Sequence, residues 1–134
     1  MNYIVHRRFT NKAICGQVDL PEGSTCESSG NFITYEGKPV CVITSENSHQ
    51  YFAVNGDGQG LLRGKLTQAI QNCLKVRDDD YQTRWDKIWN DKRCQKYKRI
   101  EHQDFWLWNH AFFNAPIEDL EYIANLIDLK EINK

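Results

Sequence analysis

The sequence predicts an α+β protein in which a small N-terminal antiparallel β-sheet packs with a C-terminal group of about four helices. Short runs rich in β-branched and aromatic residues, separated by turns that contain glycine or proline, continue up to Ile43. From Ser45 onward, apolar residues recur at the spacing of amphipathic helices. The 134 residues are expected to form a single domain, 1–134, with a β-rich sub-lobe and a short helix over 1–55 and a helical sub-lobe over 60–134.

Local composition predicts the strands of the N-terminal half. Leu20-Pro21-Glu22-Gly23 is a turn by composition, because proline presets φ and glycine accepts a positive φ. Glu36-Gly37 is expected to connect two strands of a hairpin, whereas the polar residues 25–30 indicate a loop or a weak edge. The expected strands are residues 3–9, 13–18, 32–35 and 38–43.

The helices are predicted from capping residues and apolar stripes. Thr44 or Ser45 can cap a short helix, and a glycine-rich loop over 55–60 follows it. The most regular stripe lies between Leu62 and Leu74, where apolar residues recur at three- and four-residue intervals. The expected helices are residues 45–54, 62–74, 81–89, 101–113 and 117–127.

Charge and targeting features predict that the chain lies in the cytoplasm. The net charge of −1 provides no global attraction to nucleic acid or to a membrane surface. His6-Arg7-Arg8 interrupts the N-terminus where a signal peptide needs an apolar segment. No apolar run approaches the roughly 20 residues of a membrane span. Five cysteines in such a chain predict reduced thiols.

The chemistry-bearing residues of the N-terminal half predict one structural zinc ion. Three thiols and an imidazole form a complete tetrahedral ligand set, and a thin, glycine-punctuated sheet gains most from a metal. The predicted ligands are Cys15, Cys26, Cys41 and His49, with His6 as the alternative fourth ligand. In the competing interpretation, Cys41 is ordinary core and His49 lies at the surface.

Aromatic and basic residues of the helical half predict a protein-binding patch. Four tryptophans within a short segment exceed the needs of one small helical core, and aromatic residues dominate interface hot spots. The predicted partner-binding residues are Trp85, Trp89, Trp106, Trp108, Lys92, Arg93 and Lys96. The competing interpretations are that the tryptophans form core and that the basic residues form a solvated helix face or contact phosphates.

No complete catalytic motif is present, so we expect no enzyme activity. A cysteine nucleophile would require a histidine base and an orienting group that the fold brings together. No recognisable local signature surrounds any of the cysteines. A cysteine-dependent enzyme is therefore kept only as an alternative.

Several short motifs together resemble a family of small accessory proteins carried by phages and prophages. They are Ile14-Cys15-Gly16, Leu20-Pro21-x-Gly23, Gly37-Lys38-Pro39-Val40-Cys41, Thr44-Ser45-Glu46-Asn47 and Arg63-Gly64-Lys65-Leu66. Within that family the chain is most similar to zinc-holding type II anti-CRISPR proteins. The resemblance implies a non-enzymatic inhibitor that binds the RNA-guided nuclease of the host as a monomer or small homo-oligomer. A zinc-containing nucleic-acid-binding regulator of a mobile element is the first alternative.

Overall fold

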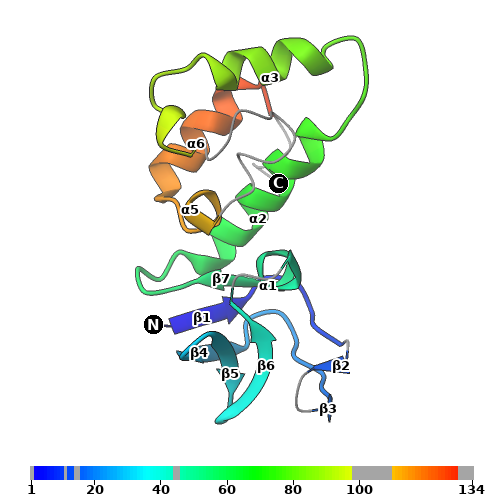
Figure 1. Ribbon diagram of the computed structural model, residues 1–134, viewed down its shortest axis with the longest axis vertical. Helices are drawn as coiled ribbons and strands as arrows, with labels where there is room; N and C mark the ends of the chain where they lie inside the picture. The colour runs from blue at the N-terminus through cyan, green and yellow to red at the C-terminus, as the bar shows by residue number, and fades with distance from the viewer. Residues whose placement is uncertain (1, 11, 14–15, 44–45, 98–109, 130–134) are drawn as a thin grey trace. The chain divides into compact units, whose positions relative to one another are not determined.

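The protein has an α+β fold, with a five-stranded antiparallel sheet in the N-terminal half and helices mostly in the C-terminal half. The computed structural model describes residues 2–10, 12–13, 16–43, 46–97 and 110–129 (Figure 1). The chain divides into two compact units, Met1–Gly64 and Lys65–Lys134, which are described separately below.

The first unit is built on the five-stranded sheet, whose strand order is β6-β5-β4-β1-β7. Every neighbouring pair in this sheet is antiparallel. A separate two-stranded ribbon joins β2 (Lys12–Ala13) and β3 (Gly16–Gln17). The strands of the main sheet are β1 (Asn2–Val5), β4 (Thr25–Ser29), β5 (Phe32–Tyr35), β6 (Lys38–Val42) and β7 (Phe52–Val54).

The predicted β5–β6 hairpin is confirmed, and its turn has a specific geometry. Glu36 and Gly37 both have positive φ, at 51° and 82°, as the type I′ turn of a two-residue hairpin requires. Farther along the hairpin, the register shifts between Ile33 and Thr34. This irregularity leaves Val40 as an extra residue of β6, and both Val40 and Cys41 are buried.

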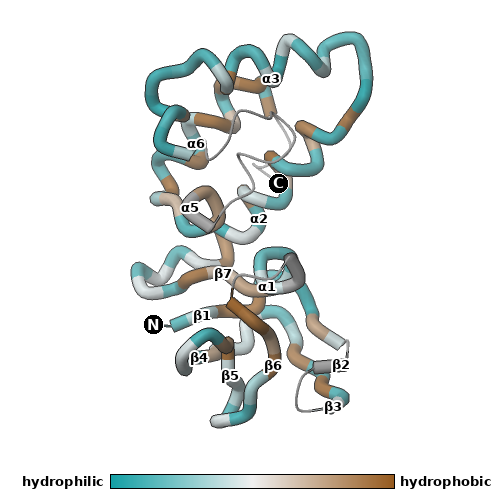
Figure 2. Tube along the Cα trace, viewed as in Figure 1, coloured by the Kyte–Doolittle hydropathy of each residue, from teal (hydrophilic) through white to brown (hydrophobic). Residues whose placement is uncertain are grey.

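One face of the sheet carries the core of the first unit. Side chains alternate between the two faces of a strand, and the cross-strand partners Tyr3 and Cys26 therefore share this inner face. Figure 2 shows the hydrophobic character of β6 and the hydrophilic turn before it. The buried core comprises Tyr3, Val5, Phe9, Leu20, Cys26, Ile33, Val40, Cys41 and Phe52.

Four sequence-based expectations in the first unit are wrong. The single strand expected over 13–18 is replaced by β2 and β3, which pair antiparallel with each other. Residues 25–30, expected as a loop or weak edge, include β4, which pairs with β1 on one side and β5 on the other. The helix expected over 45–54 ends early, because α1 covers Glu46–Tyr51 and β7 follows immediately. The strand expected over 3–9 ends at Val5, and Phe9 forms only an isolated bridge with Leu20.

The loop before α2 (Gly60–Leu74) is tied to the first unit by a buried arginine. The Arg63 guanidinium donates to the carbonyl of Val54 at 2.7 Å and to the Asp57 carboxylate at 2.5 Å. Asn55 Oδ1 accepts from the Gly60 backbone N–H at 2.8 Å, which satisfies a donor at the start of the helix. The side chains of residues 55–60 thus stabilise the loop and the helix start.

The second unit is helical, as predicted. It contains most of α2, followed by α3 (Tyr81–Trp89), a short 3₁₀ segment (Gln95–Tyr97), α5 (His110–Phe113) and α6 (Ile117–Leu126). Residues 101–109 of the predicted 101–113 helix lie outside the described residues. Within the part of the chain that the structure describes, no helix has the length and apolar character needed to cross a membrane.

Apolar stripes of these helices form the core of the second unit. The predicted stripe of α2 contributes Leu66, Ile70 and Leu74, all buried, and Cys73 packs against the same core. Among the described residues, the buried apolar side chains of this core are Leu66, Ile70, Leu74, Trp85, Ile88, Cys94, Tyr97, Phe112, Phe113, Ala115, Leu120, Ile123, Ala124 and Ile127.

Candidate functional site

Two of the predicted zinc ligands, Cys26 and Cys41, lie on the inner face of the sheet. Ile33 of β5 is paired with Cys41 of β6 on one side and with Ser28 of β4 on the other. Directly paired residues point to the same face, so Cys41 and Ser28 share a face. Cys26 is two residues from Ser28 and therefore also points to that face. Strand β5 separates the two cysteines by two strand spacings, and Cys26 is also offset by two residues along β4. Their backbones are therefore roughly 12 Å apart.

These two buried thiols would have to lose their protons to bind zinc. Both Cys26 and Cys41 are buried, and desolvation raises the pKa of Cys26 to about 11. Burial thus favours the protonated thiol, whereas zinc binds the thiolate and releases the proton. Two sulfurs on one zinc ion lie within about 4.6 Å of each other, so a shared ion would require both side chains to turn toward β5.

The side chain of one candidate histidine, His6, contacts the backbone carbonyl of the other, His49. His49 lies in α1 and is partly buried, while His6 is buried at the end of β1. His6 Nε2 lies 3.1 Å from the carbonyl oxygen of His49. Because a carbonyl can only accept, Nε2 must carry the proton and cannot bind a metal in this arrangement.

The complete zinc set stays a prediction because Cys15 lies outside the described residues. Among the residues that are described, no three His, Cys, Asp or Glu side chains gather around a common point. Cys26 and Cys41 share a face, His49 follows in α1, and Cys15 would have to complete the shell. The donor types still match those of structural zinc.

The described tryptophans of the predicted partner-binding patch occupy different environments. Trp85 is buried, and its indole N–H donates to the carbonyl of Leu74 at 3.1 Å. This side chain therefore serves the core of the second unit. Trp89 is only partly buried and packs at the border of that core. Trp106 and Trp108 lie outside the described residues.

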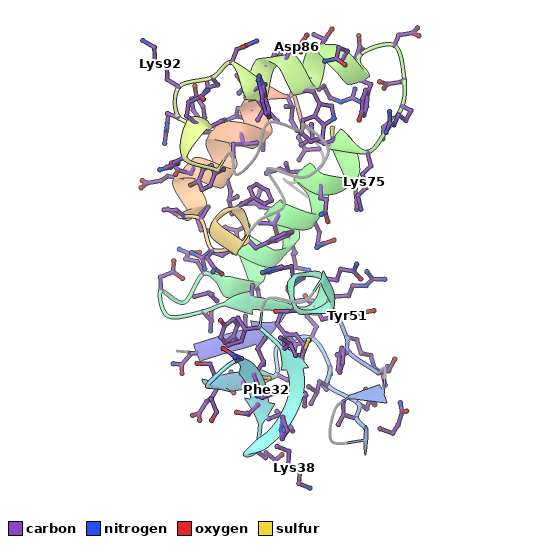
Figure 3. The ribbon with its side chains drawn as sticks, viewed as in Figure 1. Phe32, Lys38, Tyr51, Lys75, Asp86 and Lys92 are labelled. Atoms are coloured by element: carbon purple, nitrogen blue, oxygen red, sulfur yellow. The ribbon has the colours of Figure 1, made fainter. Side chains whose placement is uncertain are left out.

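The basic residues of the same patch surround a buried carboxylate. Asp119, in the first turn of α6, accepts from Arg93 at 2.8 Å and from Lys96 at 2.7 Å. Only 8% of the Asp119 side chain is exposed, whereas Arg93 and Lys96 remain 50% and 60% exposed. Lys92 is exposed as well (Figure 3). The patch consequently contains two cations fixed by Asp119 and one that extends into solvent.

Tyr97 completes the environment of Asp119 and was not predicted from the sequence as a site residue. Its hydroxyl donates to Asp119 Oδ2 at 2.5 Å. Burial would raise the pKa of Asp119, but the bonds from Lys96, Tyr97 and Arg93 outweigh it and lower that pKa to about 2. Burial, together with the bond to Asp119, raises the pKa of Tyr97. Asp119 is therefore a carboxylate throughout the neutral pH range.

A second carboxylate, Asp91, joins the residues that directly follow α3 to α6. It accepts from the Tyr122 hydroxyl at 2.5 Å and from the backbone N–H of Arg93 at 2.8 Å. The Arg93 guanidinium stacks 4.2 Å from the centre of the Tyr122 ring, a cation–π contact. Asp91 and Asp119 are far in sequence from most of their side-chain partners, so only the fold brings these groups together.

Comparisons with known proteins add no relative to this picture. No protein-family model matches the chain. No significant match is found among curated proteins or among solved structures.

Proposed function

We propose that the chain is a non-enzymatic inhibitor from a phage or prophage that binds a type II CRISPR nuclease of its host. The identity of the partner rests on the short motifs within residues 14–66, which resemble those of the phage protein family. The binding role rests on the patch formed by Trp89, Lys92, Arg93 and Lys96 in the second unit. We do not assign a reaction to any residue.

The binding role is supported mainly by the ion pairs that hold Arg93 and Lys96 against Asp119. Both cations keep about half of their side-chain surface exposed while one buried carboxylate holds them. Side chains that are ordered before binding lose less conformational entropy in a complex. Trp89 adds a partly exposed aromatic side chain from α3, and aromatic and arginine residues are enriched at interfaces.

Two of the described cysteines, Cys26 and Cys94, favour this proposal over a cysteine-dependent enzyme. A nucleophilic cysteine needs a lowered pKa and access to solvent. Burial instead raises the pKa of Cys26 to about 11 and that of Cys94 to about 12. These two thiols are uncharged at neutral pH and poorly placed for nucleophilic attack.

The same ion pairs make protein binding a better proposal than phosphate binding. A surface that binds nucleic acid neutralises phosphates with cations that lack another partner. Here the charge of Asp119 partly offsets those of Arg93 and Lys96. The first alternative, a zinc-containing regulator that binds nucleic acid, would then depend on Lys92 and on residues outside the described ranges.

A pull-down and DNA-cleavage assay with several purified type II nucleases tests the proposal. We expect the protein to bind at least one nuclease at micromolar concentration or below and to slow cleavage of its target. A parallel titration with labelled duplex DNA at two salt concentrations tests the first alternative. Unhindered cleavage by every nuclease, with no complex at micromolar concentration, would exclude the inhibitor.

A further inference from the structure

The outer face of the sheet, opposite the core, presents a row of polar side chains across three strands. Asn2 of β1 pairs with Glu27 of β4, and Glu27 pairs with Thr34 of β5. Directly paired residues point to the same face. Thr25 extends this row, since it is two residues from Glu27 on the same strand. Glu36 follows Thr34 in the β5–β6 turn.

These polar residues line a cavity of about 440 Å³. Its lining residues all belong to the first unit: Asn2, Tyr3, Thr25, Cys26, Glu27, Thr34, Glu36, Gly37 and Asn55. The charged members are Glu27 and Glu36, both exposed at the cavity, and no lysine or arginine is among the lining residues. Glu36 also accepts a bond from Tyr35, which raises the pKa of that phenol. The cavity is therefore acidic and rich in acceptors.

An exposed apolar pair adjoins the cavity on the same face. Phe32 of β5 is directly paired with Val42 of β6, and the two residues are 39% and 38% exposed. Phe32 precedes Thr34 by two residues, which corresponds to about 6.8 Å along the strand. Figure 3 shows Phe32 on the sheet. The outer face thus combines an acidic cavity with an apolar contact area one side-chain repeat away.

We propose that this face binds a segment of a partner protein that carries an arginine or lysine beside an apolar side chain. The cationic group enters the cavity and donates to the carboxylates of Glu27 and Glu36, while the apolar side chain covers Phe32 and Val42. Guanidinium and ammonium groups are the protein cations that match such acceptors. Nucleic acid does not fit, because its phosphates and the two carboxylates have the same charge sign.

The inference goes beyond the proposed function, because it concerns a different surface and holds for any protein partner with this chemistry. In an extended peptide, residues two positions apart lie on one side at the same spacing of about 6.8 Å. A short peptide with arginine and leucine separated by one alanine therefore reproduces the proposed ligand chemistry without knowledge of the natural partner.

The test is an NMR titration of the isotope-labelled full chain with that capped peptide. A matched peptide with citrulline in place of arginine keeps the shape and removes the charge. We expect millimolar affinity for so small a ligand, with amide shifts concentrated at Asn2, Glu27, Thr34, Glu36 and Phe32. The citrulline peptide should bind about 2- to 30-fold more weakly, as the loss of two exposed ion pairs predicts.

Protein variants test the same contact from the other side. The double variant Glu27→Gln/Glu36→Gln should weaken binding of the arginine peptide about 2- to 30-fold, whereas Glu121→Gln, at an exposed position of α6, should not change it. Val42→Thr should weaken binding of both peptides, and Val76→Thr is its control, because Val76 is 50% exposed in the second unit.

Four outcomes would overturn the proposal. They are equal affinity for the arginine and citrulline peptides, shifts concentrated in the second unit, no shifts at 10 mM peptide, and shifts of the cavity amides by Ca²⁺ at lower concentration than by peptide. The last outcome would assign the cavity to a metal ion. Because the two peptides are compared on the unmodified chain, the test remains decisive if a variant does not fold.

Discussion

The imidazole of His6 lies directly against the Cα atom of Gly64. A β-carbon added at Gly64 would overlap the His6 ring. The ring is buried, and its Nε2 donates to the carbonyl of His49, so the ring is held in place. Glycine at this position of α2 is therefore required by the close approach of β1 and α2 within the first unit.

Gly64→Ala should consequently destabilise the protein although alanine is the better helix former. Helix propensity alone would add up to about 1 kcal/mol of stability, whereas overpacking against a fixed ring costs about 1–3 kcal/mol or more. The free energy of unfolding, measured by urea denaturation, should therefore fall. Gly56→Ala is the matched control, because a β-carbon there meets no atom within 4 Å. Equal stability of the two variants would contradict the contact.

Asp119→Ala should destabilise the second unit strongly. The substitution removes the acceptor of Tyr97, Arg93 and Lys96 and leaves the buried Tyr97 hydroxyl without this bond. Loss of a buried, charged acceptor of this kind costs about 3 kcal/mol. Thermal unfolding followed by circular dichroism measures the change. Asp19→Ala, which removes the exposed ion pair with Arg8, should leave the melting temperature almost unchanged.

Stability should fall between about pH 4 and pH 2. Bonds from Arg63 lower the pKa of Asp57 to about 2, and Asp119 has a similarly low pKa. An unfolded aspartate has a pKa of about 3.9, so the unfolded state binds more protons in this window. The stabilisation is complete above pH 4 and is lost as the pH falls through the folded pKa. Urea midpoints at pH 7, 4, 3 and 2 should show this decrease, and Asp119→Asn should make it smaller.

The zinc prediction is tested by native mass spectrometry with elemental analysis. One zinc ion per chain is expected, and Cys15→Ser should lose it together with several kcal/mol of stability, because binding and folding are coupled. Cys73→Ser should keep the metal and cost about 1–3 kcal/mol, the penalty for burying a hydroxyl. Stoichiometric zinc in both the Cys15→Ser and Cys41→Ser variants would exclude this ligand set.

The proposed inhibitor surface predicts a charge-reversal effect. Lys92→Glu should weaken binding to the nuclease and restore DNA cleavage, because Lys92 is an exposed cation of the patch. Lys75→Glu has the same charge change at another exposed position of the second unit (Figure 3) and should inhibit like the unmodified protein. Equal inhibition by both variants would remove Lys92 from the interface.

The parts of the fold that local pattern determines were predictable. The α2 stripe from Leu66 to Leu74 repeats regularly enough to identify a helix, and Glu36-Gly37 is a recognisable hairpin turn. β4 was missed because Thr25–Ser29 is polar apart from Cys26. Its strand conformation depends on hydrogen bonding to β1 and β5, which no local pattern encodes.

The candidate sites were harder to predict for the same reason. Asp119 and Tyr97 are 22 residues apart, and the residues of the outer-face cavity come from four strands or their ends. Residue type identified Cys26 and Cys41 as candidate ligands, but only the register places them on one face. The sequence identifies the donor and acceptor residues, but only the three-dimensional structure shows which of them are in contact.

The irregular outermost strand β6 has a consequence for behaviour at high concentration. Pro39 has no N–H to donate, and the extra residue Val40 bends the strand. A straight, fully hydrogen-bonding edge would recruit further chains into fibres. Because β6 contains both a proline and an irregular register, we expect this edge to be a poor template for the addition of further strands, even at high protein concentration.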